Sequence, residues 1–375
     1  MPTGIVVLVG FAYFLQVVLA DPNLFPELRT LVVRWDGTNV DSRISFFTSK
    51  SLQRIVHREY SQAAENHLSL VHASLAARNR RLSSVEIRGS DVDGHLITNL
   101  LHTSLTNNFS LTLSPHYSEN PVFQRDQNWF MALATSHNLT SLRIDGSFAS
   151  QNVTGELESQ RDYYRIRVLQ QLDFQSIAGR YHQLLKRCRF PQLTTISIKT
   201  RRMESWDNWL TALSDSAPRL TKLSITVPSS SSPELVGGSL RVTEAEIIGS
   251  VLHLAKLESS ILSGPRSIPL SDSTLSTIIQ NIPFHLEKLC LPVDFTKGPI
   301  LSFRNLDHPN TKLKKLCFCS QMILPEPLRN RISIAEFLCY LAPSARALPF
   351  RGHLTPSLVV DFEDLRRYVA KNIQA

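Results

Sequence analysis

A short pattern of leucine and other apolar residues recurs along most of this chain of 375 residues. The pattern is L-x-x-L-x-L, in which the second and third anchors can be any apolar residue, as in LTKLSI at 220–225 and LEKLCL at 286–291. Clear copies begin at Leu28, Leu82, Leu139, Leu169, Leu193, Leu220, Leu286 and Leu313, and weaker copies begin at Leu52, Asn108, Leu254 and Ala345. By subtraction, successive copies begin between 24 and 34 residues apart. Uneven steps of about this length, each with one short strand, predict a solenoid of leucine-rich type.

Burial of the anchors explains why such a pattern repeats. The anchors alternate with polar residues at period two, so each strand has one apolar face and one solvent-exposed face. A single strand cannot bury its anchors alone, but a stack of parallel strands forms a continuous core. Helix-like segments that could return the chain to the next parallel strand begin at Ser61, Ser205, Thr243, Asp272 and Ser333. We therefore predict the α/β class, as a leucine-rich-repeat solenoid with a curved parallel sheet on the concave side and helices on the convex side.

The domain organisation follows from the extent of the repeats. No linker separates two independently composed halves, which predicts one solenoid over residues 25–350 and a capping segment over residues 351–375. The middle anchors Leu223, Leu289 and Leu316 are expected to be buried.

Residues 1–24 form an apolar segment with two possible roles. Residues 4–20 carry no charge and end in Val18-Leu19-Ala20, a small-residue cleavage pattern typical of a signal peptide or an anchor. Alternatively, the segment is the capping helix of the solenoid, because an apolar helix, a proline and L-x-x-L follow one another here as they do in later repeats. The five cysteines all lie in the second half, and an odd, lopsided set favours a reducing compartment. Cytoplasm or nucleus is therefore expected, with secretion through a signal peptide ending near Ala20 as the alternative.

The sequence carries no recognisable catalytic signature. It contains no G-x-S-x-G, G-x-x-x-x-G-K-[ST], H-E-x-x-H or G-x-G-x-x-G, and its 12 histidines are scattered. We expect no enzyme activity, cofactor, metal site or small-molecule substrate. The formal charge of +8 is a moderate excess spread along the chain, which permits an acidic protein partner but does not require nucleic acid. A membrane would be a partner only if the N-terminal segment is an anchor.

Alignment of the copies places polar residues in columns across neighbouring strands. The column two residues after each start contains four consecutive lysines, and the column six residues after each start opens with three arginines. Together these are the candidate partner-binding residues: Lys222, Lys256, Lys288, Lys315, Arg34, Arg58 and Arg88. An acidic partner would bind such a strip, and the alternative is a solvated face that happens to favour lysine. Cys290 and Cys317 share the column four residues after the start, and we expect both to be free thiols.

Several copies of the pattern are preceded by Phe-Pro or Ala-Pro, and these segments resemble a known family. FPELRTLVV at 25–33, FPQLTTISI at 190–198 and APRLTKLSI at 217–225, with SIAEFLCYLAPSARAL at 333–348, resemble the fungal F-box and leucine-rich-repeat proteins. The resemblance covers the repeat region, and no F-box segment is found in the sequence. It implies a non-catalytic scaffold for protein binding, related to the substrate-recognition subunits of ubiquitin ligases. The alternative function is a secreted or membrane-tethered recognition module.

Overall fold

The computed structural model describes residues 27–34, 51–60, 82–89, 106–113, 133–145, 164–176, 185, 188–200, 212–226, 254, 256–263, 268–269, 285–291, 293–294 and 314–318. The strands in these residues fall into two compact units, β1 to β8 in the first and β9 to β15 in the second. The predicted boundaries near residues 24 and 350 lie outside the described residues.

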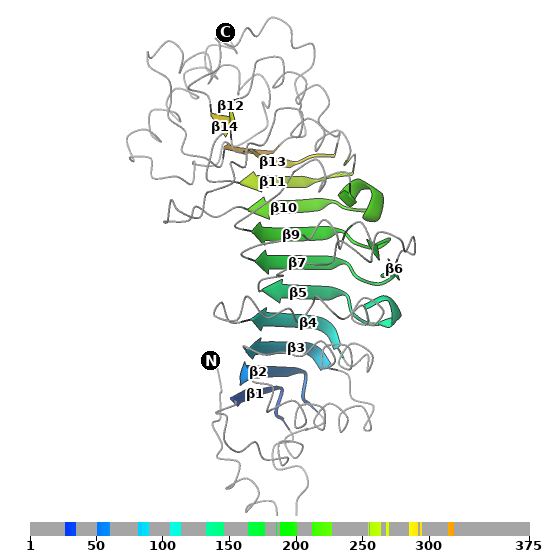
Figure 1. Ribbon diagram of the computed structural model, residues 1–375, viewed down its shortest axis with the longest axis vertical. Helices are drawn as coiled ribbons and strands as arrows, with labels where there is room; N and C mark the ends of the chain where they lie inside the picture. The colour runs from blue at the N-terminus through cyan, green and yellow to red at the C-terminus, as the bar shows by residue number, and fades with distance from the viewer. Residues whose placement is uncertain are drawn as a thin grey trace, which may run out of the picture. The chain divides into compact units, whose positions relative to one another are not determined.

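The first unit is built on a parallel sheet with one strand per coil. Its strands follow one another in the order β1-β2-β3-β4-β5-β7 (Figure 1). They are β1 (Thr30–Arg34), β2 (Arg54–Tyr60), β3 (Leu82–Gly89), β4 (Thr106–Leu113), β5 (Ser141–Asp145) and β7 (Gln171–Ser176). Each strand pairs in parallel with the next. Two short strands, β6 (Tyr164–Arg165) and β8 (Cys188–Arg189), form a separate parallel pair.

The second unit has the same construction. Its main strands, in the order β9-β10-β11-β13-β15, are β9 (Thr195–Thr200), β10 (Lys222–Thr226), β11 (Ser259–Ser263), β13 (Lys288–Leu291) and β15 (Lys315–Phe318). All four pairings are parallel, including β9 with β10. A short parallel pair is formed by β12 (Ile268–Pro269) and β14 (Val293–Asp294). One parallel strand per coil confirms the predicted leucine-rich-repeat solenoid.

Helical backbone is described in three places. Residues 133–135, residue 185 and residues 212–216 are helical, and the last stretch lies in the helix predicted from Ser205. The other predicted helices lie outside the described residues.

Main-chain hydrogen bonds join successive coils just before each strand begins. In the second unit, the carbonyl oxygen of Thr194 accepts from the backbone N–H groups of Thr221 and Lys222, both at 2.9 Å. The carbonyls of Thr221 and Glu258 accept in the same way from the next coil. In the first unit the carbonyls that accept two such bonds are those of Arg29, Gln53 and Thr140. Because one carbonyl serves two donors at each of these steps, the bonds fix the register of the coils there.

The apolar anchors form the core of each unit. Phe174 and Ile87 are fully buried in the first unit, and Ile225 is fully buried in the second. Two of the three predicted middle anchors are confirmed, since Leu223 and Leu289 are 1% and 2% exposed. The side chain of Leu316 lies outside those described.

Two of the weaker copies were assigned a wrong starting residue. The first is the copy placed at Asn108. Asn108 pairs with Ser84 on β3, so Asn108, rather than Ser110, belongs to the polar column. Phe109 is buried and occupies the middle anchor, which makes Thr106 the first anchor. A threonine in place of the usual leucine concealed the true start.

The second wrong start is the copy placed at Leu254. The backbone N–H of Leu257 donates to the carbonyl of Leu254 at 3.1 Å, in the same kind of turn that joins Leu220 to Ala217. Leu257 is therefore the first anchor. Ser260, which is 3% exposed, occupies the middle anchor. Because a serine at the middle anchor departs from the pattern, the sequence matches it from the leucine three residues earlier.

Candidate functional site

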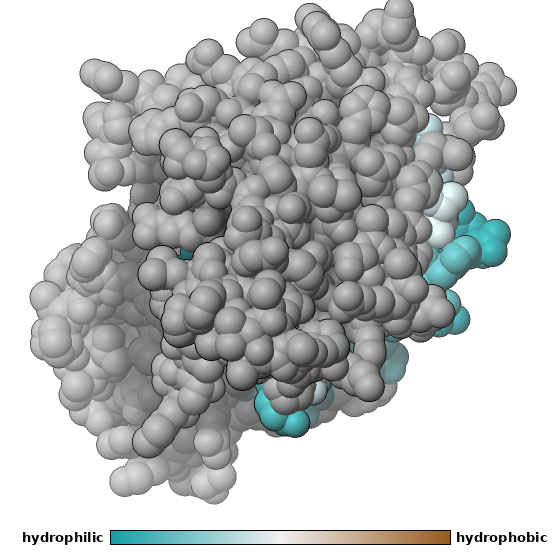
Figure 2. Space-filling model, turned by 90° about the horizontal axis from the view of Figure 1, so that it is seen from below, coloured by the Kyte–Doolittle hydropathy of each residue, from teal (hydrophilic) through white to brown (hydrophobic). Residues whose placement is uncertain are grey.

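The candidate site is the polar face of the strands, defined as the positions two, four and six residues after each first anchor. These side chains alternate with the buried anchors along every strand. In the view of Figure 2, the described residues that can be seen are teal or nearly white. The charged polar-face residues with described side chains in the first unit are Arg54, Arg58, Glu86, Arg88, Arg143, Asp145 and Asp173.

The predicted column of four lysines is wrong at one position. Lys222 pairs with Ser259, and Ser259 pairs with Lys288. Lys256 is exposed in the turn before β11 and does not lie in the column. The column in the second unit therefore reads lysine, serine, lysine, lysine, with Lys288 paired to Lys315. The error follows directly from the wrong start at Leu254, because that start moved every residue of the coil by three.

The polar face of the second unit is basic even with three lysines in the column. Its described side chains include Lys199, Lys222 and Lys288 and contain no carboxylate. The carboxylate of Glu287 lies one residue before β13, where it contacts the Nζ atom of Lys314 at 2.7 Å, and both side chains are exposed. Screening by water keeps such exposed ion pairs weak.

The predicted arginine column spans β1, β2 and β3, and the strand register supports it between β1 and β2 but not between β2 and β3. Arg34 pairs with Arg58 across β1 and β2. The pairing of β2 with β3 shifts after His57, which pairs with Ile87, so Arg58 has no register partner in Arg88. A shift in register of this kind is an irregularity that re-aims the side chains beyond it.

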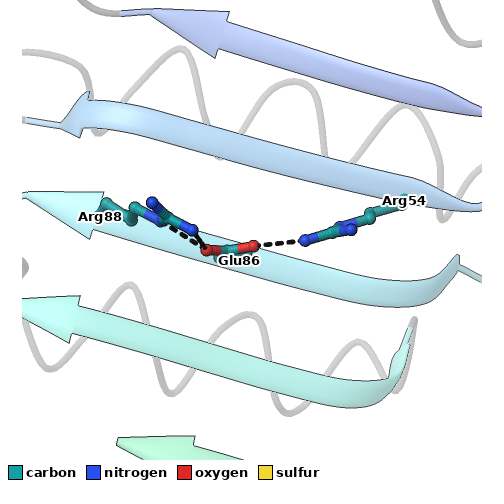
Figure 3. Close-up of polar contacts among 3 residues, drawn as sticks. All are labelled: Arg54, Glu86 and Arg88. Atoms are coloured by element: carbon teal, nitrogen blue, oxygen red, sulfur yellow. Dashed lines mark hydrogen bonds and ion pairs between the residues drawn. The ribbon is translucent and has the colours of Figure 1, made fainter. Parts of the chain in front are cut away.

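An ion-pair cluster of three residues lies on β2 and β3 of the first unit. Figure 3 shows Glu86 between Arg54 on β2 and Arg88 on its own strand. The Nη2 atom of Arg54 donates to Oε2 of Glu86 at 2.7 Å, and Nε and Nη2 of Arg88 both lie 2.5 Å from Oε1. Each carboxylate oxygen is therefore bound by a different arginine.

The charge state of Glu86 follows from competing effects. Burial alone raises the pKa of this carboxyl, because it disfavours the charged form. Hydrogen bonds from Arg54 and Arg88, together with their positive charges, lower the pKa, and the net result is a pKa below its ordinary value. The cluster therefore keeps Glu86 ionised at neutral pH.

The lowered pKa predicts how Glu86 affects stability. A carboxyl whose pKa is depressed on folding stabilises the protein above its ordinary pKa of about 4.3, and this stabilisation is lost as the pH falls through the folded pKa. We expect Glu86→Gln to lower the free energy of unfolding by about 1–2 kcal/mol at about pH 6, because the arginines are half exposed. The difference should shrink as the pH falls from about 5 toward 3. Urea unfolding at several pH values measures it, with Ser110→Ala as an uncharged control on the neighbouring strand.

A second ion pair lies further along the same face. Arg143 and Asp173 are register partners on β5 and β7, and the Nε atom of Arg143 lies 3.6 Å from Oδ2 of Asp173. Gln175 donates a hydrogen bond to the same oxygen, at 3.4 Å. The carboxylate of Asp173 is more exposed than that of Glu86, at 29% against 9%, whereas the arginines are exposed to a similar extent.

Sequence reasoning named Arg88 as a candidate but missed Arg54 and Glu86. Arg54 was visible in the column two residues after the start, but it stood there as a single arginine among uncharged residues. The available signal was diagonal: one glutamate four residues after a start, an arginine two residues later, and a second arginine in the preceding repeat. Only the parallel register shows that these three residues converge.

Other predictions concern chemistry outside the cluster. Cys290 on β13 and Cys317 on β15 are register partners, as their shared column predicts, and Cys290 is a buried thiol. Among the described residues no group of His, Cys, Asp or Glu could hold a metal ion. In the same part of the chain, no helix is long and apolar enough to cross a membrane.

The stacked parallel strands, the buried anchors and the repeated carbonyl bonds define the chain as a leucine-rich-repeat protein. No model of a known protein family matches the chain, and no curated protein matches it.

Solved structures of low similarity were found. One is the leucine-rich-repeat protein LegL7 from Legionella pneumophila, at 13% identity and a TM-score of 0.40, covering 91% of this chain and 98% of that one. Another is the complex of Rad7 and Elc1 in yeast, at 12% identity and a TM-score of 0.39, covering 93% of this chain and 86% of that one. A third is the TLR13 complex with ssRNA13, at 14% identity and a TM-score of 0.37, covering 87% of this chain and 36% of that one.

Proposed function

We propose that this protein is a non-catalytic scaffold that binds another protein through the polar face of its strands. One observation carries the proposal: in each unit, consecutive parallel strands bury their anchors on one side and present rows of mostly polar and charged side chains on the other, with apolar exceptions that include Val32, Val56 and Cys290. A rigid, continuous row of this kind offers many contacts in fixed register, which is how repeat proteins bind their partners.

Site-specific crosslinking tests the location of this binding surface. A photo-crosslinking residue at the exposed polar-face position of Gln171 should form adducts with the native partner. The same residue at Arg167, which is exposed in the segment before β7, is the matched control. Equal crosslinking at both positions, or adducts at the control alone, would disprove binding through the polar face.

The partner is proposed to be acidic where it meets the second unit. The described polar-face side chains there are basic or uncharged, and a basic strip attracts acidic surfaces from a distance. Lys222, Lys288 and Lys315 supply the strip in the corrected register.

Replacing these three lysines with glutamine is expected to weaken partner binding about tenfold at low salt. The variant should also show a flatter dependence of affinity on salt, because salt screens the attraction that the lysines supply. Titration of the partner at several salt concentrations measures both effects. Lys256→Gln, which removes one positive charge outside the column, is the control for each of the three replacements made singly. Unchanged affinity and salt slope in the triple variant would mean that the lysines are only a solvated surface.

The family resemblance suggests the finer role of a substrate-recognition subunit related to the F-box proteins of ubiquitin ligases, in the cytoplasm or nucleus. Co-purification with a cullin subunit from native extract would support this role, and its consistent absence from otherwise intact complexes would contradict it. The second candidate is a secreted or membrane-tethered recognition module, favoured by the uncharged residues 4–20. A mature chain that begins at Asp21 would establish secretion and exclude the ubiquitin-ligase role.

A further inference from the structure

One buried carboxylate holds two half-exposed arginines on the polar face of the first unit. The side chain of Glu86 is 9% exposed, whereas those of Arg54 and Arg88 are 50% and 52% exposed. The acidic group is thus withdrawn from solvent while the guanidinium groups remain accessible. A ligand that approaches this face meets the arginines first.

The guanidinium groups keep hydrogen-bond donors that Glu86 does not use. A guanidinium carries five N–H donors in one plane. Within the described residues, Glu86 accepts from one nitrogen of Arg54 and from two nitrogens of Arg88. The remaining donors are available to a second acceptor group, and their directions are fixed because the guanidinium planes are already held.

The local charge also favours an anionic ligand. Arg58 is exposed on β2, directly after His57, and His57 pairs with Ile87, the residue before Arg88. Among the described side chains of β2 and β3, three guanidinium groups and one carboxylate leave two net positive charges.

We propose that Arg54 and Arg88, held in place by Glu86, bind an aspartate or glutamate side chain in an acidic segment of the partner protein. This inference rests on the proposed function and adds a defined contact in the first unit. The planar fork of arginine matches a carboxylate with two parallel hydrogen bonds, which a lysine cannot reproduce. Glu86 is a positioning residue: it orders two flexible side chains before the partner arrives, which lowers the entropy lost on binding.

A labelled acidic peptide serves as the probe. The peptide consists of glutamate and glycine, is acetylated and amidated at its ends, and is titrated against the full chain by fluorescence polarisation. The same peptide with glutamine in place of glutamate is the ligand control. We expect binding of the glutamate peptide only, and a loss of about fivefold in affinity for Arg88→Lys, which keeps the charge but not the planar fork. Equal binding of Arg88→Lys would show that only charge matters and would overturn the proposal.

Glu86→Gln gives the sharpest test because two explanations predict opposite signs. If Glu86 merely places a negative charge near the ligand, its removal should tighten binding of the acidic peptide. If Glu86 positions the arginines, its removal should weaken binding, and we expect about threefold. Asp173→Asn is the matched control on the same face, and its binding should be unchanged or slightly tighter. Tighter binding by Glu86→Gln would refute the positioning role.

Two further measurements keep the result interpretable. Circular dichroism establishes that each variant is folded, and Arg54→Lys, with the same expected fivefold loss, replaces Glu86→Gln if that variant does not fold.

A phosphoserine peptide of matched length distinguishes a phosphate site from a carboxylate site. If this peptide binds at least about tenfold more tightly, with the same dependence on Arg54 and Arg88, the carboxylate assignment is wrong. The peptide assay needs no native partner, so its outcome is independent of the crosslinking experiment. A negative peptide result would refute the carboxylate site without refuting the scaffold proposal, and a negative crosslinking result would refute binding through the polar face without refuting the carboxylate site.

Discussion

Replacing Leu223 with alanine is expected to lower the free energy of unfolding by about 2–5 kcal/mol. Leu223 is the middle anchor of β10 and is 1% exposed. It lies between Ile196 on β9 and Ser260 on β11 in the parallel register. The truncation removes apolar contacts on both sides and leaves a cavity that the neighbouring strands can close only in part.

Urea unfolding followed by circular dichroism measures this loss. Ser224→Ala is the control, because Ser224 is the next residue on β10 and lies on the polar face. Its effect should stay within about 0.5 kcal/mol. A loss below about 1 kcal/mol for Leu223→Ala would mean that this side chain does not contribute to the core as its burial indicates.

The fold could be predicted from sequence wherever leucine filled the first anchor and an apolar residue filled the next two. The copies at Leu139, Leu169 and Leu193 are of this kind, and each begins where the structure places it. Alternation at period two is a strong constraint in such a strand, because a shift of one residue would expose every anchor. The start predicted at Leu52 is also confirmed, even though the third anchor of that copy is His57, a buried histidine.

The two wrong starts show where this reasoning fails. Thr106 and Ser260 are polar residues at anchor positions, and Ser260 is buried there. Sequence alone cannot distinguish a polar residue at a buried anchor from one on the solvent-exposed face, because the pattern carries no information on what surrounds the residue. The backbone bonds that the carbonyl of Thr221 accepts from Glu258 and Ser259 resolve the question, since they fix the coil independently of side-chain type.

The candidate site was predicted only in part, for a related reason. A column analysis compares residues directly opposite each other on neighbouring strands. The contact of Arg54 with Glu86 is diagonal, because Arg54 pairs with Ser84 and Val56 pairs with Glu86. Diagonal neighbours on a sheet are within reach of long side chains. The arginine column drew attention to the correct strands, but the burial of Glu86 that orders the cluster required the structure.

Adjacent serines on β11 provide the second prediction with a large expected effect. Ser260→Lys would place an ammonium group at the middle anchor, between Leu223 on β10 and Leu289 on β13. Burying an unpaired charge is among the most costly single changes, and we expect a loss on the order of 4 kcal/mol or more. Ser260→Ala, which removes the buried hydroxyl without adding charge, controls for the loss of the serine itself.

Ser259→Lys should have the opposite outcome although it lies one residue away. Ser259 lies on the polar face between Lys222 and Lys288, so its replacement would create the uninterrupted lysine column that the sequence wrongly predicted. Repulsion from the two neighbours should cost only a few tenths of a kcal/mol, and the added charge should steepen the salt dependence of binding to an acidic partner. Unfolding curves and salt titrations of both variants measure these effects. If Ser259→Lys is the damaging change and Ser260→Lys is tolerated, the register of β11 is off by one residue and the polar face of the second unit must be reassigned.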